Sequence, residues 1–117
     1  MIALPDVARV DHPGAGKVDL DLPLPEEQQA FAGHFPGQPV LPGVVQLDWA
    51  LRFAGVYLGL AQPAARDFQI KFRRIIRPGR TVGLLLTLDR AKGHLSFEYR
   101  LDGEAASSGK IRLEDPS

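Results

Sequence analysis

The stretch GVVQLDWALRFAGVYLGL, residues 43–60, decides the fold of this chain of 117 residues. Its only strongly polar residues are Gln46, Asp48 and Arg52, so the stretch is apolar on almost every side. A helix of that composition must be enclosed by other structure, because little of its surface is suited to water. The stretch therefore predicts one long central helix around which the rest of the chain is arranged.

The segment before this helix is a rigid loop that carries a histidine. From His34 to Gly43 the loop contains three prolines and two glycines. Such a loop has few conformations to lose, so a side chain on it can be held in a fixed place. Loop and helix together join one histidine to the carboxylate of Asp48 in apolar surroundings, and this pair of groups is suited to acid–base chemistry.

The remaining segments read mostly as strands. Residues 17–22 alternate as a strand does, and Pro25-Glu26-Glu27 marks a short helix that ends near Gly33. Alternation and turn signals predict further strands at residues 68–76, 82–88 and 94–101, and a last strand that follows the Asp102-Gly103 hairpin signal and ends near residue 113. One helix with about five largely antiparallel strands indicates an α+β architecture. We expect a curved sheet wrapped around the helix, the hot-dog fold, as a single domain over residues 1–117.

Composition narrows the classes of function. Fourteen basic and fourteen acidic residues balance, so no overall field favours nucleic acid or an anionic membrane. The absence of cysteine excludes disulfides, thiolate zinc sites and a cysteine nucleophile. No segment approaches the roughly 18 apolar residues that cross a bilayer, and the first residues lack the pattern of a secretory signal. We expect a cytoplasmic protein without membrane insertion and without a metal site.

The loop and the start of the helix resemble the active-site signature of a known enzyme family. The pattern His34-Phe35-Pro36-Gly37-x-Pro39-Val40-x-Pro42-Gly43-Val44, followed by Leu47-Asp48, is similar to that of 3-hydroxyacyl-[acyl-carrier-protein] dehydratases of the FabA/FabZ type. Lys71-Phe72-Arg73-Arg74 and Arg77-Pro78-Gly79 resemble the next strand and turn of that family. The fuller wording, with Val45-Gln46-Leu47-Asp48-Trp49-Ala50, most resembles the ApeI-like dehydratases of aryl polyene biosynthesis.

The resemblance implies dehydration of a 3-hydroxyacyl thioester to the trans-2-enoyl thioester, in fatty acid or aryl polyene biosynthesis. It implies that His34 takes the C2 proton and that Asp48 delivers a proton to the 3-hydroxyl, directly or through water. Gly43 would direct its backbone N–H at the thioester oxygen from the start of the helix, where the helix dipole adds favourable potential. The residues implied to contact substrate are Phe35, Val40, Leu41, Pro42 and Arg52.

The resemblance also implies partners. The substrate arrives on the phosphopantetheine arm of an acyl carrier protein, which is typically acidic, and the reaction uses no metal or redox cofactor. The family builds its site across a dimer, with His34 of one subunit facing Asp48 of the other. We therefore expect a homodimer or a higher even oligomer, or a heterodimer with a related hot-dog subunit. The expected carrier dock is the one dense cationic cluster of the sequence, Lys71, Arg73, Arg74, Arg77 and Arg80.

Alternatives remain open from the sequence. The chain could be a hot-dog acyl thioesterase, although its His34-Phe35-Pro36-Gly37 loop argues against this, or a non-catalytic partner subunit of a related dehydratase, which would need neither His34 nor Asp48. The cationic cluster could be the solvated face of an edge strand. Arg52 stands where the fatty-acid enzymes usually have glutamine, four residues after Asp48. It could pair with Asp48 and favour the ionised carboxylate, or face the substrate, and we favour the second role.

Overall fold

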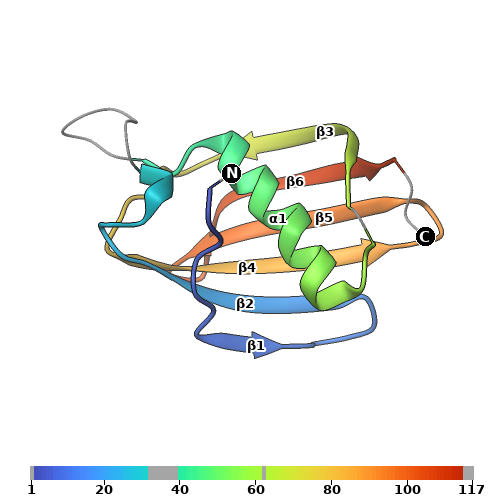
Figure 1. Cartoon of the computed structure of the whole chain (residues 1–117), viewed down its shortest axis with the longest axis horizontal. Helices are drawn as coiled ribbons and strands as arrows, with labels where there is room; N and C mark the ends of the chain where they lie inside the picture. The colour runs from blue at the N-terminus through green and yellow to red at the C-terminus, as the bar shows by residue number, and fades with distance from the viewer. Residues whose placement is uncertain (1, 32–39, 62, 115–117) are drawn as a thin grey trace.

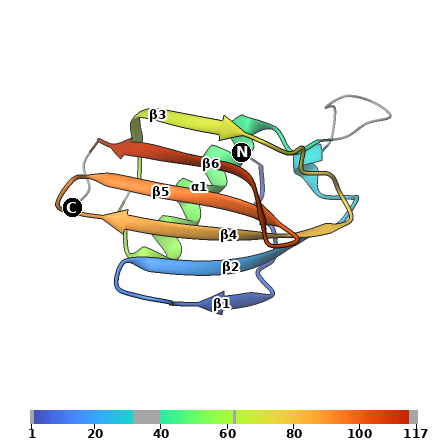
Figure 2. The same cartoon turned by 180° about the vertical axis from the view of Figure 1, so that it is seen from behind.

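The computed structural model of the protein describes residues 2–31, 40–61 and 63–114. Its strands form one antiparallel sheet in the order β1-β2-β4-β5-β6-β3, and one long helix lies across one face of that sheet (Figures 1 and 2). The strands are β1 (Arg9–Asp11), β2 (Lys17–Leu24), β3 (Ala65–Phe72), β4 (Arg80–Asp89), β5 (His94–Leu101) and β6 (Glu104–Leu113), and the helical elements are the 3₁₀ turn η1 (Gln29–Phe31) and the helix α1 (Gly43–Leu58).

The predicted α+β arrangement is present, with corrections to its details. The described sheet has six strands instead of about five, because β1 is a three-residue edge strand, too short to show alternation in the sequence. Of the short helix predicted from Pro25 to near Gly33, the described residues 25–31 contain a 3₁₀ turn and no α-helix. β3 ends at Phe72 instead of residue 76, because the amides of Arg73 and Arg74 both donate to the carbonyl of Ala106 and the chain leaves the ladder there.

Residues with a left-handed backbone conformation end α1 and form the turn of the last hairpin. Helix α1 ends at Leu58 because Gly59 adopts a φ of 73°, a conformation that glycine takes without steric cost. Asp102 and Gly103 have φ values of 52° and 80° and join β5 to β6 in the two-residue turn that the sequence predicts.

The core lies between α1 and the inner face of the sheet. Strands β2, β4 and β5 alternate buried and partly exposed residues, and their buried side chains meet the buried residues of α1, which packs over β4 and β2 (Figure 1). Trp49 of α1 is fully buried, and its indole N–H has no hydrogen-bond partner among the described residues. This packing fixes the rotation of α1, and so fixes which of its side chains remain accessible.

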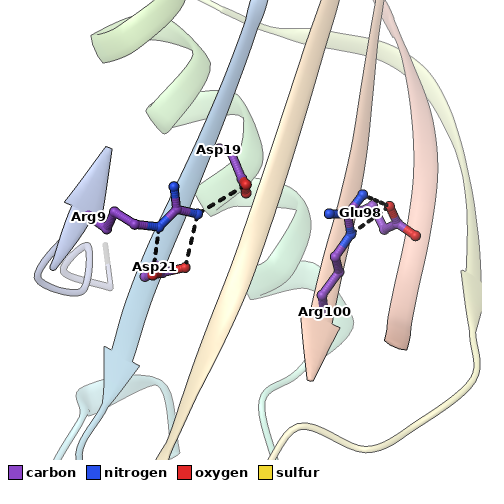
Figure 3. A network of polar contacts seen from close by, with 5 residues as sticks. All are labelled: Arg9, Asp19, Asp21, Glu98 and Arg100. Atoms are coloured by element: carbon purple, nitrogen blue, oxygen red, sulfur yellow. Dashed lines mark hydrogen bonds and ion pairs between the residues drawn. The ribbon is translucent and has the colours of Figure 1, made fainter. Parts of the chain in front are cut away.

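The outer face of the sheet is polar. Arg9 pairs with Asp19 at 3.0 Å and with Asp21 at 2.8 Å, and Arg100 pairs with Glu98 at 2.7 Å (Figure 3). Charged pairs of this kind suit a surface that meets water. The helix-covered face is therefore the side of the sheet on which an apolar site can form.

The segment before β1 runs beside α1 (Figure 1). Ile2, Leu4 and Val7 pack against the core, and the amide of Ala8 donates to the carbonyl of Asp21 at 2.8 Å. This segment closes one flank of the helix. None of the described helices has the length and apolar character that a membrane-spanning helix needs.

Candidate active site

The first turn of α1 has two backbone donors that find no acceptor among the described residues. Pro42 occupies the N-cap position and supplies no side-chain hydrogen bond, while the amides of Val45 and Gln46 each donate to the Pro42 carbonyl at 3.1 Å. The amides of Gly43 and Val44 donate to no described residue. Unpaired N–H groups at a helix N-terminus, where the helix dipole is positive, are suited to hold a developing negative charge.

Gly43 lies against the edge of the sheet. A Cβ atom at this position would stand 2.6 Å from Cζ of Phe72, which is closer than real Cβ atoms approach, so a larger residue would require the exposed Phe72 ring to move. The ring of Phe72 therefore occupies the space that a side chain at residue 43 would need. The contact brings the start of α1 to the end of β3.

An apolar groove opens between α1 and β3. It encloses about 460 Å³ and is lined by Gly43, Val44, Leu47, Phe68, Ile70 and Phe72. Three of these side chains are more than half exposed, namely Val44 at 74%, Phe68 at 51% and Phe72 at 60%. Exposed apolar side chains gathered in one groove mark a surface suited to bind an acyl chain or another protein.

Asp48 lies one helical turn after Val44, on the same side of α1. Its side chain is 43% exposed, and its Oδ2 accepts a hydrogen bond of 3.2 Å from Nη1 of Arg52. Its Oδ1 accepts no hydrogen bond from a described residue. Within the described part of the chain, Arg52 thus holds one oxygen of the carboxylate, and the other receives no donor.

Arg52 links Asp48 to the segment before β1. Its Nη1 also donates to the carbonyl of Ile2 at 2.6 Å, and its side chain is 27% exposed. Of the two roles that the sequence left open for Arg52, the structure shows the ion pair with Asp48. The substrate-facing role that we favoured stays a prediction.

The loop residues are only partly described. His34 and Phe35, the predicted base and one predicted substrate contact, lie outside the described residues. Leu41 is 4% exposed and belongs to the hydrophobic core, whereas Val40 and Pro42 are partly exposed. The structure therefore places Gly43, Asp48 and Arg52 on one helix and does not address their distance from His34.

The predicted cationic cluster divides into two groups. Arg74 pairs with Glu104 at 3.4 Å and donates to the Leu101 carbonyl at 3.2 Å, and Arg80 pairs with Asp102 at 2.5 Å. Lys71, Arg73 and Arg77 form no ion pair with a described residue. Lys71 stands between Ile70 and Phe72 in β3, so alternation directs it to the face opposite the groove.

The family is decided by comparison with known proteins. The sequence profile described as "ApeI-like: ApeI dehydratase" matches residues 10–110. The chain belongs to the ApeI-like dehydratase family. The predicted enzyme class is thereby confirmed: the ApeI-like chain is a dehydratase.

Individual relatives agree with this family. The 3-hydroxyacyl-[acyl-carrier-protein] dehydratase FabZ of Oenococcus oeni is 37% identical over 95 residues, which cover 72% of this chain and 68% of that protein. The corresponding FabZ of Rickettsia bellii is 28% identical over 92 residues, covering 69% of this chain and 63% of that protein. The matched regions thus span about two thirds of these relatives.

Solved structures confirm the hot-dog fold of the ApeI-like chain. The dehydratase heterocomplex ApeI:P from Xenorhabdus doucetiae contains a chain that is 35% identical, with a TM-score of 0.87, and the match covers 95% of this chain and 98% of that one. Thioesterase superfamily member 2 from Mus musculus, at 12% identity and a TM-score of 0.66, covering 90% of this chain and 80% of that one, shares the fold alone.

Two residues near the site of this ApeI-like dehydratase escaped sequence reasoning. The Tyr99 hydroxyl on β5 donates to the Gln46 carbonyl at 2.6 Å, and Ser107 on β6 donates to the Gln46 side chain at 2.6 Å. Burial, with the nearby negative charge of Asp48 as the second cause, raises the pKa of Tyr99, so its phenol stays a donor. Alternation in the sequence indicates that Tyr99 is buried, but nothing in the sequence indicates its partner.

The described residues hold no group of three or more metal-ligating side chains of His, Asp or Glu.

Proposed function

We propose that this chain dehydrates 3-hydroxyacyl thioesters bound to the phosphopantetheine arm of an acyl carrier protein, in fatty acid or aryl polyene biosynthesis. The observation that carries the proposal is the position of Asp48. It is a partly exposed acid on a helix that packs on the core, one turn beyond the amides of Gly43 and Val44, which donate to no described residue, and beside an apolar groove. That arrangement supplies a carboxyl group, an oxyanion site and an apolar wall within one helix.

The reaction needs two proton transfers and one charge-stabilising contact. His34 removes the C2 proton, and the electron pair of that C–H bond becomes the second C2–C3 bond as the C3–O bond breaks. Asp48 gives a proton to the departing hydroxyl, which leaves as water, and the proton on His34 is then available to restore the carboxyl. The amide of Gly43 donates to the thioester oxygen, where negative charge develops.

Arg52 shapes the carboxyl group for this role. By holding Oδ2, it leaves Oδ1 as the oxygen that meets the 3-hydroxyl or an intervening water. Donation to the departing hydroxyl requires that this carboxyl carries a proton at that moment. The contact with Arg52 therefore gives the proposed acid a fixed orientation.

The groove supports an assembly with a second hot-dog subunit. β3 is an edge strand whose outer side pairs with no described strand, and its residues Phe68 and Phe72 leave apolar surface uncovered. An exposed apolar edge strand is normally covered by another chain. We propose that a second copy, or a related subunit as in the ApeI:P heterocomplex, covers this edge and brings its own His34 toward Asp48.

The carrier protein would dock on the cations that no internal partner neutralises. Lys71, Arg73 and Arg77 have this property within the described residues, whereas Arg74 and Arg80 are already paired. An acidic carrier is attracted by such unneutralised charge. Because the reaction transfers protons and expels water without any net oxidation or reduction, we propose that it uses no metal and no redox cofactor.

A panel of carrier-bound and coenzyme A-bound 3-hydroxyacyl thioesters tests the proposal. The purified protein should form the conjugated enoyl product, followed by its absorbance, and His34→Ala or Asp48→Asn should lower the rate on the order of a hundredfold or more. Release of free thiol without enoyl product would instead assign a thioesterase. Activity that appears only when a related hot-dog dehydratase subunit is added, and that survives both substitutions, would assign a non-catalytic partner.

A further inference from the structure

A buried polar network joins the start of α1 to the sheet. Gln46 is 3% exposed and Ser107 is fully buried, and they are the two buried polar residues of the described core. The Ser107 hydroxyl donates to Oε1 of Gln46 at 2.6 Å, and Nε2 of Gln46 donates to the Leu41 carbonyl at 3.0 Å. The amide side chain of Gln46 therefore connects β6 to the last residues of the loop before α1.

Two further hydrogen bonds hold the same residues. The Leu41 amide donates to the Ile76 carbonyl at 2.8 Å, so both peptide groups of Leu41 are fixed. The Tyr99 hydroxyl fixes the main-chain carbonyl of Gln46 at 2.6 Å. The first turn of α1 is thus attached to β5, to β6 and to the segment that follows β3.

Core stability alone does not require this network. A buried amide and a buried hydroxyl that satisfy each other contribute little more than apolar side chains of the same shape. Apolar side chains cannot fix the direction of the Leu41 carbonyl. This carbonyl lies before the N-cap and takes no part in the main-chain hydrogen bonds of α1. Leu41 stands two residues before Gly43 and seven residues after His34.

We propose that Gln46 is a positioning residue of the active site. It holds the Leu41 carbonyl, and thereby fixes both the place where the loop bearing His34 meets α1 and the direction of the Gly43 amide. This inference rests on the dehydratase mechanism proposed above. Gln46 does not contact substrate in this role, because its side chain is buried beneath the first turn of the helix.

The role sets a strict chemical requirement on residue 46. The side chain must accept from the Ser107 hydroxyl and donate to the Leu41 carbonyl at the same time. An amide meets both conditions, and so does a neutral carboxyl, whereas a carboxylate only accepts and would repel the Leu41 carbonyl. Gln46→Glu should therefore function only while the introduced carboxyl is protonated.

Burial gives that variant a definite pH dependence. The pKa of a buried carboxyl is raised, because burial disfavours its charged form. The network should be intact at pH values below the ordinary carboxyl pKa, and should be lost progressively as the pH rises through the raised pKa of the folded protein. The activity of Gln46→Glu relative to the parent should therefore increase as the pH falls.

The experiment compares Gln46→Glu, Gln46→Met and the control Leu95→Ala. Leu95 is fully buried on β5 and pairs with Leu88 and Ile111, away from the Tyr99–Ser107 pair, so its substitution lowers stability without touching the network. In Gln46→Met, kcat should fall on the order of tenfold to a hundredfold, because small displacements of reacting groups are costly. Amide hydrogen exchange at residues 41 and 45, whose amides donate to the Ile76 and Pro42 carbonyls, should be faster in Gln46→Met than in Leu95→Ala at matched thermal stability.

The readouts separate this inference from the proposed function. Equal amide exchange at residues 41 and 45 in Gln46→Met and Leu95→Ala overturns the positioning role, whatever the activity. A ratio of Gln46→Glu to parent activity that does not change with pH also overturns it. If the parent forms no enoyl product at all, the proposed function fails, and faster exchange in Gln46→Met would still support the attachment of the loop through Gln46.

Discussion

The inner face of the sheet carries large apolar side chains on β2 and β4 and also on β3, but those on β2 and β4 are buried and those on β3 are exposed. On β2 and β4, Leu20 and Leu84 are fully buried beneath α1. On β3, Phe68 and Phe72 face the same side of the sheet and are 51% and 60% exposed. The difference teaches that alternation in a strand reports which face is apolar, and that a separate element must cover it. In this chain α1 covers one half, and we propose that a second subunit covers the other.

The largest effect is expected in the covered half. Leu84→Ala should lower the free energy of unfolding by about 2–5 kcal/mol, because it leaves a cavity in a closed core. Urea denaturation at a fixed protein concentration measures this loss. A loss below about 1 kcal/mol would mean that the covered half is packed no better than the exposed half.

Substitutions in the exposed half, on β3, should change the association of subunits and not the stability of the single subunit. Phe68→Ser should leave the subunit folded but weaken its association, and should lower dehydration at least tenfold if the site is shared between subunits. Sedimentation at several concentrations measures the association. Val10→Ser is the matched control, since Val10 is 45% exposed on the opposite edge strand β1. If Phe68→Ser and Val10→Ser both associate as strongly as the parent does, β3 is not part of the interface.

The shared site itself can be tested by complementation. Mixing inactive His34→Ala and Asp48→Ala proteins should restore part of the activity, because a mixed pair of subunits holds one intact and one doubly altered site. Activity should rise with the rate of subunit exchange, followed by a labelled subunit. Exchange without recovered activity would show that His34 and Asp48 act within one chain.

The cations beside the exposed half should affect only carrier-bound substrate. Arg73→Glu with Arg77→Glu should raise KM for the carrier thioester several-fold, in a salt-sensitive manner, and leave short soluble thioesters nearly unaffected. Arg80→Glu is a control, because Arg80 is already paired with Asp102. Equal losses on both substrates would assign Arg73 and Arg77 to the fold or to the site.

The smallest effect on stability is expected at Arg52, on the flank of α1. Arg52→Gln removes a helical ion pair worth about 0.3–0.5 kcal/mol. It also removes a bond to the Ile2 carbonyl that contributes about 1 kcal/mol. Thermal melting measures this sum, and kinetics with several acyl chains measure the function. A lower kcat with unchanged chain preference would support orientation of Asp48, and an altered preference would support contact with substrate.

Much of the fold could be predicted because its signals are local. The apolar composition of residues 43–60 indicates α1, strict alternation indicates β5, and Asp102-Gly103 indicates the last hairpin. The predicted end of β3 at residue 76 was wrong: alternation stops at Arg73-Arg74, and there the amides of both residues donate to the distant Ala106 carbonyl, so the chain leaves the ladder. β1 is too short to carry a pattern.

The site was predictable where a motif carries it and hidden where contacts are distant in sequence. Gly43 and Asp48 stand in the motif, and their places on α1 follow from it. The Ser107–Gln46 bond joins residues 61 positions apart, and the partner of Arg52 at Ile2 is a backbone carbonyl, which no pattern of side chains reveals. The same holds for the pairing of Arg80 with Asp102, which depends on where a hairpin returns.

The buried indole of Trp49 can serve as a fluorescent reporter of the packing of α1 next to Asp48. The chain has a single tryptophan, so its ultraviolet emission comes from one indole, which is fully buried and adjoins Asp48 in sequence. An indole without a hydrogen-bond partner in an apolar setting emits at short wavelength, and water shifts that emission to the red. The wavelength of the emitted light therefore reports whether the helix that carries Asp48, the proposed acid, is still enclosed, without any label and in the same cuvette as the enoyl assay.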